Sequence, residues 1–256
     1  MVQGGAPESA TERSSVADER ATPAAFKAAL LRLAVGTAVG WAAGALIGGV
    51  GGRAAMLILR LTSPSYVRGI ESDDGFEIGA FTGDTLFLVG LTAFAGAFLG
   101  AAYVALRRWL PGSRRPTIVA VALGTVGGAA VIEPGGVDFT LLEPRWLGVA
   151  LFVALPTAFG AVLAWGVERA ISRVDRRSPA GWTFAILLLP VVPVLALGPP
   201  GVLAALSALG WMAVRHWPAA GRVWWSTPVT VAGRALGGAG TAVAAAVLAQ
   251  DIIEIL

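Results

Sequence analysis

Residues 36–52 read GTAVGWAAGALIGGVGG, and within this stretch glycine returns at every fourth position. On an α-helix, which turns about 100° per residue, such a row forms a narrow stripe that drifts slowly around the axis. Because glycine has no side chain, the stripe is a groove in which the backbone of a second helix can lie at close range. In water these glycines would destabilise a helix by up to about 1 kcal/mol each, whereas lipid offers the backbone no other hydrogen-bond partner. The stretch therefore predicts a membrane-embedded helix that packs through Gly36, Gly40, Gly44, Gly48 and Gly52.

The composition of the whole chain also requires lipid around it. Of the 256 residues, 56% are hydrophobic and 14% are charged, whereas a soluble domain is about 25% charged. The arginines fall in clusters between apolar runs and do not form one basic face, a pattern typical of membrane orientation and not of nucleic-acid binding. We therefore expect an all-α fold, a polytopic transmembrane helical bundle with glycine-rich packing faces, whose surroundings are the lipid bilayer and which has no nucleic-acid partner.

The residue inventory excludes several kinds of chemistry. The chain has no cysteine, which excludes disulfides, thiolate metal sites and a cysteine nucleophile. Its one histidine, His216, excludes haem ligation by two histidines of one chain. No G-x-S-x-G, H-E-x-x-H or Walker A motif occurs. The sequence thus predicts no cofactor, no catalytic residue and no metal site, and it favours a protein that is not an enzyme.

The pattern along the chain divides it into a tail and one membrane domain. Residues 1–24 are rich in Ser, Thr, Ala and charge, which predicts a disordered cytoplasmic tail, and residues 25–256 form a single transmembrane helical domain. About seven spans are expected, at residues 33–52, 85–106, 117–132, 147–167, 182–197, 202–214 and 228–249. The fifth and sixth segments have only about 16 and 13 residues, short of the usual ~20, so residues 182–214 form either two spans or one re-entrant hairpin.

The first helix poses a problem of length. An unbroken helix from Phe26 to Leu61 would be about 54 Å long, whereas the hydrocarbon core is about 30 Å thick. We expect it to bend at residues 48–52 and to continue as a short helix near the outer surface. If the helix were straight, Arg53 would lie inside the membrane and need a carboxylate partner such as Asp84.

Loop charges predict the orientation. Placing the N-terminus in the cytoplasm and the C-terminus outside puts most basic residues inside, as the positive-inside rule requires. All tryptophans except Trp41 fall at the ends of expected spans, as in an aromatic belt. The location that follows is the bacterial plasma membrane, with multiple passes. The inner basic residues are Arg13, Arg20, Lys27, Arg32, Arg107, Arg108, Arg114, Arg115, Arg169, Arg173, Arg176, Arg177, Arg215 and Arg222, and the outer ones are Arg53, Arg60, Arg68 and Arg145.

The candidate polar site lies at the outer side. Two arginines that follow the glycine stretch would face the acidic outer loops, forming a polar mouth in which arginines hold carboxylates or carboxylates bind a cation such as Ca²⁺ or Mg²⁺. The alternative is that these are solvated loop charges and that the first arginine anchors a helix end in the headgroups. The candidate residues are Arg53, Arg60, Asp73, Asp74, Asp84, Glu133 and Asp138.

Other helices carry small faces and one internal charge. Gly96 and Gly100 in one span, and Gly233 and Gly237 in another, repeat the spacing of four. We expect the first groove to pack on the helix at 228–249 or on a second copy, with a pore lining as the alternative. Arg234 lies about 9 Å deep by helical rise, where a long side chain can snorkel to the inner headgroups or serve a substrate.

Three segments carry a resemblance to known sequences. They are GGRAAM at 51–56, SDDGFEIGAFTGDTL at 72–86 and GVDFTLLEPRWLGVALF at 136–152. At these segments, and over about residues 40–170, the chain resembles uncharacterised multi-pass integral membrane proteins of high-GC Gram-positive (actinobacterial-type) bacteria. The resemblance implies a membrane protein of the cell envelope and brings no activity or substrate.

The sequence favours the first of three functions, with the second as its main alternative. The first is a non-enzymatic packing or assembly component, a homo-oligomer or partner of another membrane protein through its glycine faces, with acidic loops outside. The second is a small transporter or channel whose outer mouth is Arg53 with the acidic loops. The third, a lipid-modifying enzyme, would require outer carboxylates that converge in a cleft open to lipid. Charged side chains that lie inside the bundle at the depth of the membrane would favour the transporter. Exposed charged side chains around a solid core would favour the packing component.

Overall fold

The computed structural model describes residues 28–67, 69–70, 83–174 and 226–256, and every long element within these ranges is a helix. The expected tail at 1–24 lies outside the described residues. The expected segments at 182–197 and 202–214 also lie outside them, as do Asp73 and Asp74.

Four of the described helices are long and apolar enough to cross a membrane, at Ala28–Thr62, Thr85–Trp109, Arg145–Val174 and Thr227–Ile255. The elements that form these spans are η1 (Gly44–Gly51), α2 (Gly52–Thr62), α3 (Gly83–Leu106), η3 (Arg107–Trp109), α6 (Arg145–Val174) and α11 (Thr227–Ile255). A fifth helix, α4 (Arg115–Val131), has 17 residues, so it is about 26 Å long and falls short of a ~30 Å core. Short helical turns complete the chain: η2 (Ser65–Val67), η4 (Gly112–Arg114) and α5 (Val137–Thr140).

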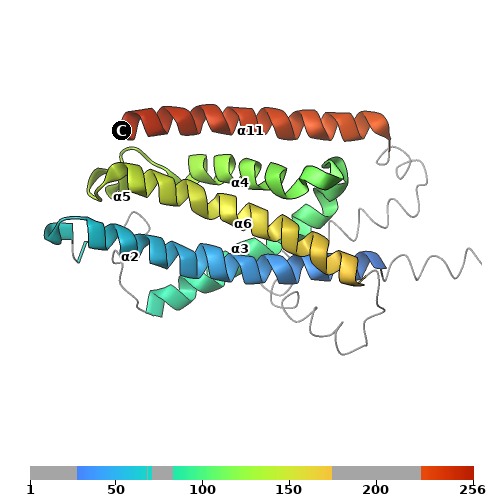
Figure 1. Cartoon of the computed structure of the whole chain (residues 1–256), viewed down its shortest axis with the longest axis horizontal. Helices are drawn as coiled ribbons and strands as arrows, with labels where there is room; N and C mark the ends of the chain where they lie inside the picture. Colours follow the sequence, from blue (N-terminus) through green and yellow to red (C-terminus); the bar gives the residue numbers. More distant parts are fainter. Residues whose placement is uncertain (1–27, 68, 71–82, 175–225) are drawn as a thin grey trace, which may run out of the picture.

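The bend expected at residues 48–52 is wrong. The first helix runs without a break from Ala28 to Thr62, and its glycine-rich middle, η1, is a π-helix (Figure 1). The hydrogen bonding continues across the junction, where the N–H of Gly52 bonds to the carbonyls of Gly48 and Gly49. Helix α3 lies against Gly48 and Gly49, and α6 lies against Gly51. Single π-helical turns are frequent at functional sites.

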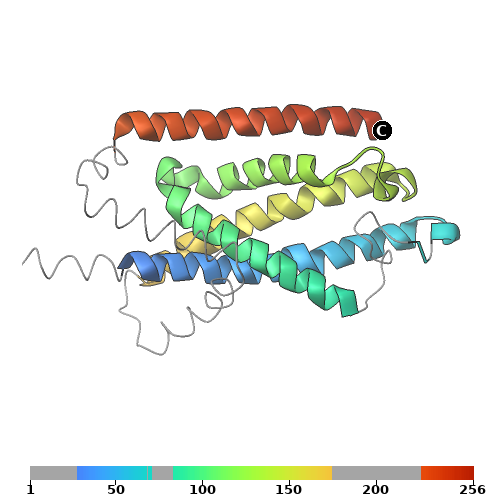
Figure 2. The same ribbon diagram turned by 180° about the vertical axis from the view of Figure 1, so that it is seen from behind.

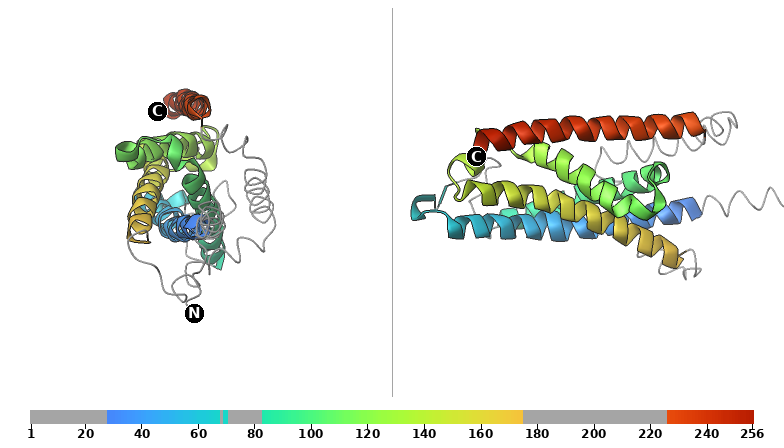
Figure 3. Two further views of the ribbon diagram at one scale, coloured as in Figure 1. Left: turned by 90° about the vertical axis from the view of Figure 1, so that its right-hand side faces the viewer. Right: turned by 45° about the horizontal axis from the view of Figure 1, so that its top comes forward.

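Two helix pairs make up the body of the bundle. The first helix is crossed by α3, α6 packs along α4, and α11 lies along the outer side of α4 (Figures 1 and 2). In the end-on view, α4, α6, the first helix and α3 follow one another around a common centre (Figure 3). The end of α2, α5 and the C-terminus lie at one end of the bundle. The start of the first helix and the end of α6 lie at the other.

The first helix and α3 meet backbone to backbone. A Cβ added to Gly36 would lie 2.6 Å from the carbonyl oxygen of Gly100, and one added to Gly40 would collide with the carbonyl oxygen of Gly96. Gly44 meets the carbonyl of Thr92 in the same way. The helix facing this groove is therefore α3 and not the helix expected, the one at 228–249.

The second pair uses the same kind of contact. A Cβ on Gly160 of α6 would lie 2.7 Å from the carbonyl oxygen of Val119 in α4, and a Cβ on Gly127 would lie 2.7 Å from Cβ of Pro156. Helix α6 continues through Pro156. On α11 the situation differs, because Gly233 lies against the ring of Trp109 whereas a Cβ on Gly237 would meet nothing within 4 Å.

Candidate functional site: a buried arginine at an internal pocket

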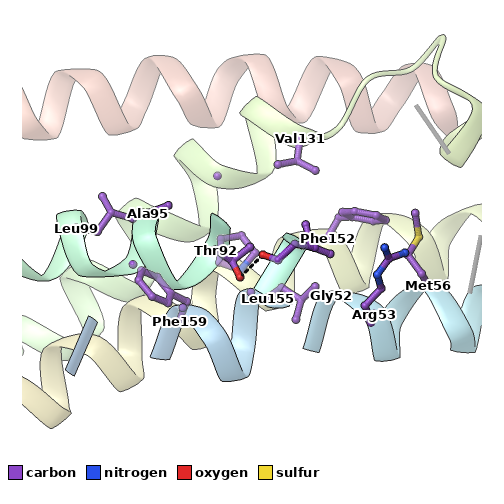
Figure 4. A pocket seen from close by; sticks show the side chains of 16 residues that line it. Gly52, Arg53, Met56, Thr92, Ala95, Leu99, Val131, Phe152, Leu155 and Phe159 are labelled. Carbon is purple, nitrogen blue, oxygen red and sulfur yellow. Dashed lines mark hydrogen bonds between the residues drawn. The ribbon is translucent and has the colours of Figure 1, made fainter. Parts of the chain in front are cut away.

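The two helix pairs enclose a pocket of about 340 Å³. The first helix, α3, α4 and α6 all contribute to its wall (Figure 4). Most of the lining is apolar. Among the described lining residues Thr92 has the one hydroxyl, which donates to Leu88 O at 2.9 Å within its own helix. The lining residues are Gly44, Gly48, Gly52, Arg53, Met56, Leu88, Thr92, Ala95, Gly96, Leu99, Gly127, Val131, Phe152, Leu155, Pro156 and Phe159.

Arg53 supplies the charge of this pocket. Its side chain points from the first helix into the bundle beside Met56 and Phe152 (Figure 4). Arg53 is only 3% exposed, whereas Arg60, seven residues further along, is half-buried. Among the described residues that line the pocket, Arg53 is the single charged one, and none is acidic.

The position of Arg53 along the bundle follows from its neighbours. Gly51 packs against Leu155, with its Cβ position 3.1 Å from Cδ2. Leu155 lies nine residues along α6 from Trp146, which is 60% exposed at the start of that helix. By helical rise, Arg53 therefore lies about 10 Å inward from the level of Trp146. Arg53 is therefore well inside the bundle, among the apolar residues that line the pocket.

The pocket opens at the side of the bundle. Two of its lining residues, Ala95 on α3 and Val131 on α4, are exposed, and Val131 is 50% exposed. Within the described part of the chain, the opening thus lies between α3 and α4, on a face that also carries exposed Leu91, four residues before Ala95 on α3. In a membrane this apolar face borders the acyl chains.

The outer residues expected to form a polar mouth occupy different settings. Asp138 on α5 is buried, with 7% exposure, whereas Glu133 is exposed. Asp84 stands in the first turn of α3. Across the described ranges, no group of three His, Cys, Asp or Glu residues could hold a metal ion. The structure therefore brings Arg53 to a pocket, and it does not gather the described carboxylates around a cation.

The loop before α6 is tied to the end of α2 through backbone groups. Thr62 Oγ1 donates to Glu143 O at 2.8 Å, and Glu143 N donates to Ser63 Oγ at 2.8 Å. At the same end, Arg145 Nη1 donates to Ile255 O at 3.4 Å and so links α6 to α11. These bonds hold together the end of the bundle at which α5 and the C-terminus lie.

A polar cluster that sequence reasoning missed lies at the opposite end. Glu168 of α6 accepts hydrogen bonds from Tyr103 Oη at 2.8 Å, from Arg107 Nη2 at 2.8 Å and from Arg115 Nη1 at 3.2 Å. Its side chain is 27% exposed, and those of the two arginines are 21% and 20% exposed. A lone acidic residue beside Arg169 and Arg173, at the basic end of the bundle, was the signal in the sequence.

Arg234 reaches a backbone carbonyl. It is exposed on α11, and its Nε donates to Trp109 O at 2.6 Å. Trp109 ends the η3 turn and also carries the ring on which Gly233 packs. The contact joins α11 to the connection between α3 and α4.

Comparison of the chain with protein-family models, with curated proteins and with solved structures found no match.

Proposed function

We propose that this chain is a small membrane transporter that binds its ligand in the pocket at Arg53. One observation supports this above all, namely that a guanidinium with 3% exposure stands in the wall of a cavity of about 340 Å³. A pocket of this size falls within the ~300–1,000 Å³ typical of small-molecule sites.

The free-energy cost of a buried arginine supports a role in binding. Placing an arginine at the centre of a membrane helix costs about 2.5–3.5 kcal/mol on insertion scales, and an ion pair only partly offsets the loss of hydration. An apolar side chain such as Met would fill the same space without that cost. An ionisable residue at this depth is therefore by default a candidate functional residue.

The glycine contacts favour the transporter over the packing component. Gly36, Gly40 and Gly44 are covered by α3 of the same chain, so a partner protein cannot use them. We propose that this glycine zipper, with Gly96 and Gly100 on α3, has the internal task of holding the two helices rigidly. The rigid crossing then fixes one wall of the pocket.

We also propose that the bundle keeps the orientation expected from its loops. The described arginines of the segments assigned to the cytoplasm gather at the end where α6 finishes, whereas the C-terminal carboxylates Asp251 and Glu254 lie at the end that holds α5. This asymmetry supports a plasma-membrane protein with its C-terminus outside. The basic residues at the end where α6 finishes are Arg32, Arg107, Arg108, Arg114, Arg115, Arg169 and Arg173.

Single-cysteine labelling tests this orientation in whole cells. Because the chain has no cysteine, Ser65→Cys and Ser113→Cys each create one thiol, and both serines are exposed at opposite ends. We expect a membrane-impermeant maleimide to label Ser65→Cys in intact cells and Ser113→Cys only after permeabilisation. The reverse pattern would contradict the orientation, and labelling of both in intact cells would contradict a membrane barrier between the two ends.

A flux measurement in proteoliposomes tests the transporter function. The full chain is reconstituted and given a panel of inorganic ions, polar solutes of either charge and amphiphiles. We expect at least one compound to cross faster than in protein-free liposomes. We expect Arg53→Gln to slow that flux about tenfold or more, because a hydrogen bond to a charged group is worth about 1.5–3 kcal/mol.

Arg60→Gln is the matched control, because it makes the same change seven residues further along the same helix and outside the pocket lining. It should keep the flux within about twofold of the unchanged protein, because Arg60 does not line the pocket. Equal flux in Arg53→Gln and Arg60→Gln would contradict a role for Arg53.

The second candidate function is assembly through α11. In the described part of the chain, only Leu248 and Ile255 of this 29-residue helix are buried. Gly237 and Gly240 have open space at their Cβ positions. If no compound of the panel crosses and copies of the chain crosslink through Leu236→Cys, which replaces an exposed residue of α11, assembly becomes the better account.

A further inference from the structure

We propose that the ligand of the pocket is an amphiphile with one anionic head and one acyl chain, which enters sideways from the membrane between α3 and α4. This inference rests on the proposed function, because it names the class of compound that the Arg53 pocket binds. The charge, shape, size and opening of the pocket each support it.

The charge of the lining matches an anionic head. Arg53 is the single charged residue among the described lining residues, and it brings guanidinium N–H donors to the wall of the pocket. A guanidinium presents its N–H donors as a planar fork, which suits the oxygen atoms of a carboxylate or a phosphate. The rest of the wall is mainly aliphatic and aromatic, with Met56, Phe152 and Phe159 among its members, so it favours an apolar body over a hydrated ion.

The shape of the pocket matches a chain attached to that head. The lining extends along α3 from Leu88 to Leu99 and along α6 from Phe152 to Phe159. By helical rise these segments cover about 16 Å and about 10 Å, and Arg53 lies toward the outer end of both. A ligand with its head at Arg53 would therefore direct its apolar part toward the middle of the membrane, as lipids of the outer leaflet do.

The volume of the pocket limits the ligand to a narrow body. About 340 Å³ is available, roughly twice the ~150 Å³ of an engineered cavity that binds benzene. This space holds part of a single acyl chain and excludes a body made of two chains side by side. The exposed lining residues Ala95 and Val131 leave a lateral entrance for the remainder of the chain.

Equilibrium binding to the full chain in nanodiscs of uncharged lipid tests this proposal. The probes are palmitate and hexadecanol, which have the same chain length and differ in the charge of the head, with inorganic phosphate and hexadecylammonium for comparison. We expect palmitate to bind at least tenfold more tightly than hexadecanol. We expect Arg53→Gln to remove that advantage and Arg60→Gln to keep it, and Arg53→Lys, which keeps the charge without the fork, to retain part of it.

A steric variant tests the pocket independently of Arg53. Gly52 lines the pocket and has nothing within 4 Å of its Cβ position, so Gly52→Leu adds a side chain at the pocket wall without a clash at its Cβ. Gly90→Leu is the matched control, because Gly90 also has open space and lies outside the pocket lining. We expect Gly52→Leu to weaken the binding of palmitate about tenfold or more. We expect Gly90→Leu to change the affinity for palmitate less than twofold.

The outcomes separate the two proposals. If the unchanged protein, Arg53→Gln and Gly52→Leu bind palmitate with equal affinity, the proposal that the ligand is an anionic amphiphile is wrong. If phosphate or a panel solute binds in a manner that depends on Gly52 and Arg53 while palmitate does not, the class of ligand is wrong and the pocket's function stands. If no compound distinguishes Gly52→Leu from Gly90→Leu, both proposals fail. Thermal unfolding of each variant confirms that it is folded.

Discussion

Gly40→Leu should abolish the folded bundle. Gly40 lies at the centre of the crossing between the first helix and α3, where a Cβ would collide with Gly96 O and would lie 3.0 Å from the Cα of Gly100. Both atoms belong to a helix backbone and cannot rotate away. The helices would have to separate along the whole glycine row, which costs more than the ~1–3 kcal/mol usual for overpacking. We expect little or no monodisperse protein after extraction, measured by size-exclusion chromatography.

Gly90→Leu and Gly52→Leu are the controls for this prediction. Both add the same side chain to a membrane helix, and neither added Cβ meets an atom within 4 Å. They should give normal yields and unfolding midpoints close to that of the unchanged protein. Gly40→Leu protein that behaves as Gly90→Leu does would show that the two backbones are not in contact at Gly40.

The sequence shows which faces pack but not which helices meet. A glycine spacing of four identifies a groove on the first helix and another at Gly96 and Gly100. The spacing carries no information on the partner, because any helix backbone can lie in such a groove. The expected partner of the groove is the helix at 228–249 or a second copy, whereas α3 of the same chain occupies it. The observed pairing joins the two helices that carry matching grooves next to each other in the chain.

The position of Arg53 depends on whether the first helix bends or continues, and the length of the helix alone does not decide between these two forms. A helix longer than the membrane can bend or protrude, and the bend was the expected solution. The structure has the continuous helix, with η1 in π-helical form, so Arg53 is placed inside the bundle, as the straight alternative required. The pocket itself could not be foreseen, because its lining comes from four helices that are far apart in sequence.

Glu168 illustrates a different limit. In the sequence it is one acidic residue within a strongly basic segment, so it reads as part of an orientation signal. Its role depends on Tyr103 and Arg107, which are 65 and 61 residues away, and on Arg115. Sequence patterns within one helix or loop do not indicate contacts between residues that are so far apart in the sequence.

Glu168→Gln should lower the free energy of unfolding by about 2 kcal/mol in uncharged detergent. The change keeps the shape of the side chain but leaves Arg107 and Arg115 close together without their shared carboxylate. Removing one partner of a fully buried ion pair costs about 3–5 kcal/mol, and the partial exposure of these three side chains reduces that figure. Thermal unfolding checks the prediction, with Glu133→Gln, at an exposed carboxylate, as the matched control.

A double-mutant cycle separates the ion pair from a general effect of lost charge. If Glu168 acts by neutralising Arg115, then Glu168→Gln combined with Arg115→Gln should destabilise the protein less than the sum of the two single changes, by about 0.5–3 kcal/mol. Strictly additive effects would contradict the coupling that the contact at 3.2 Å implies.

Anionic lipid should lessen the effect of Glu168→Gln, because lipid phosphates can take the place of the missing carboxylate at the basic end of the bundle. An effect of equal size in anionic and uncharged lipid would instead place the cluster out of reach of the headgroups.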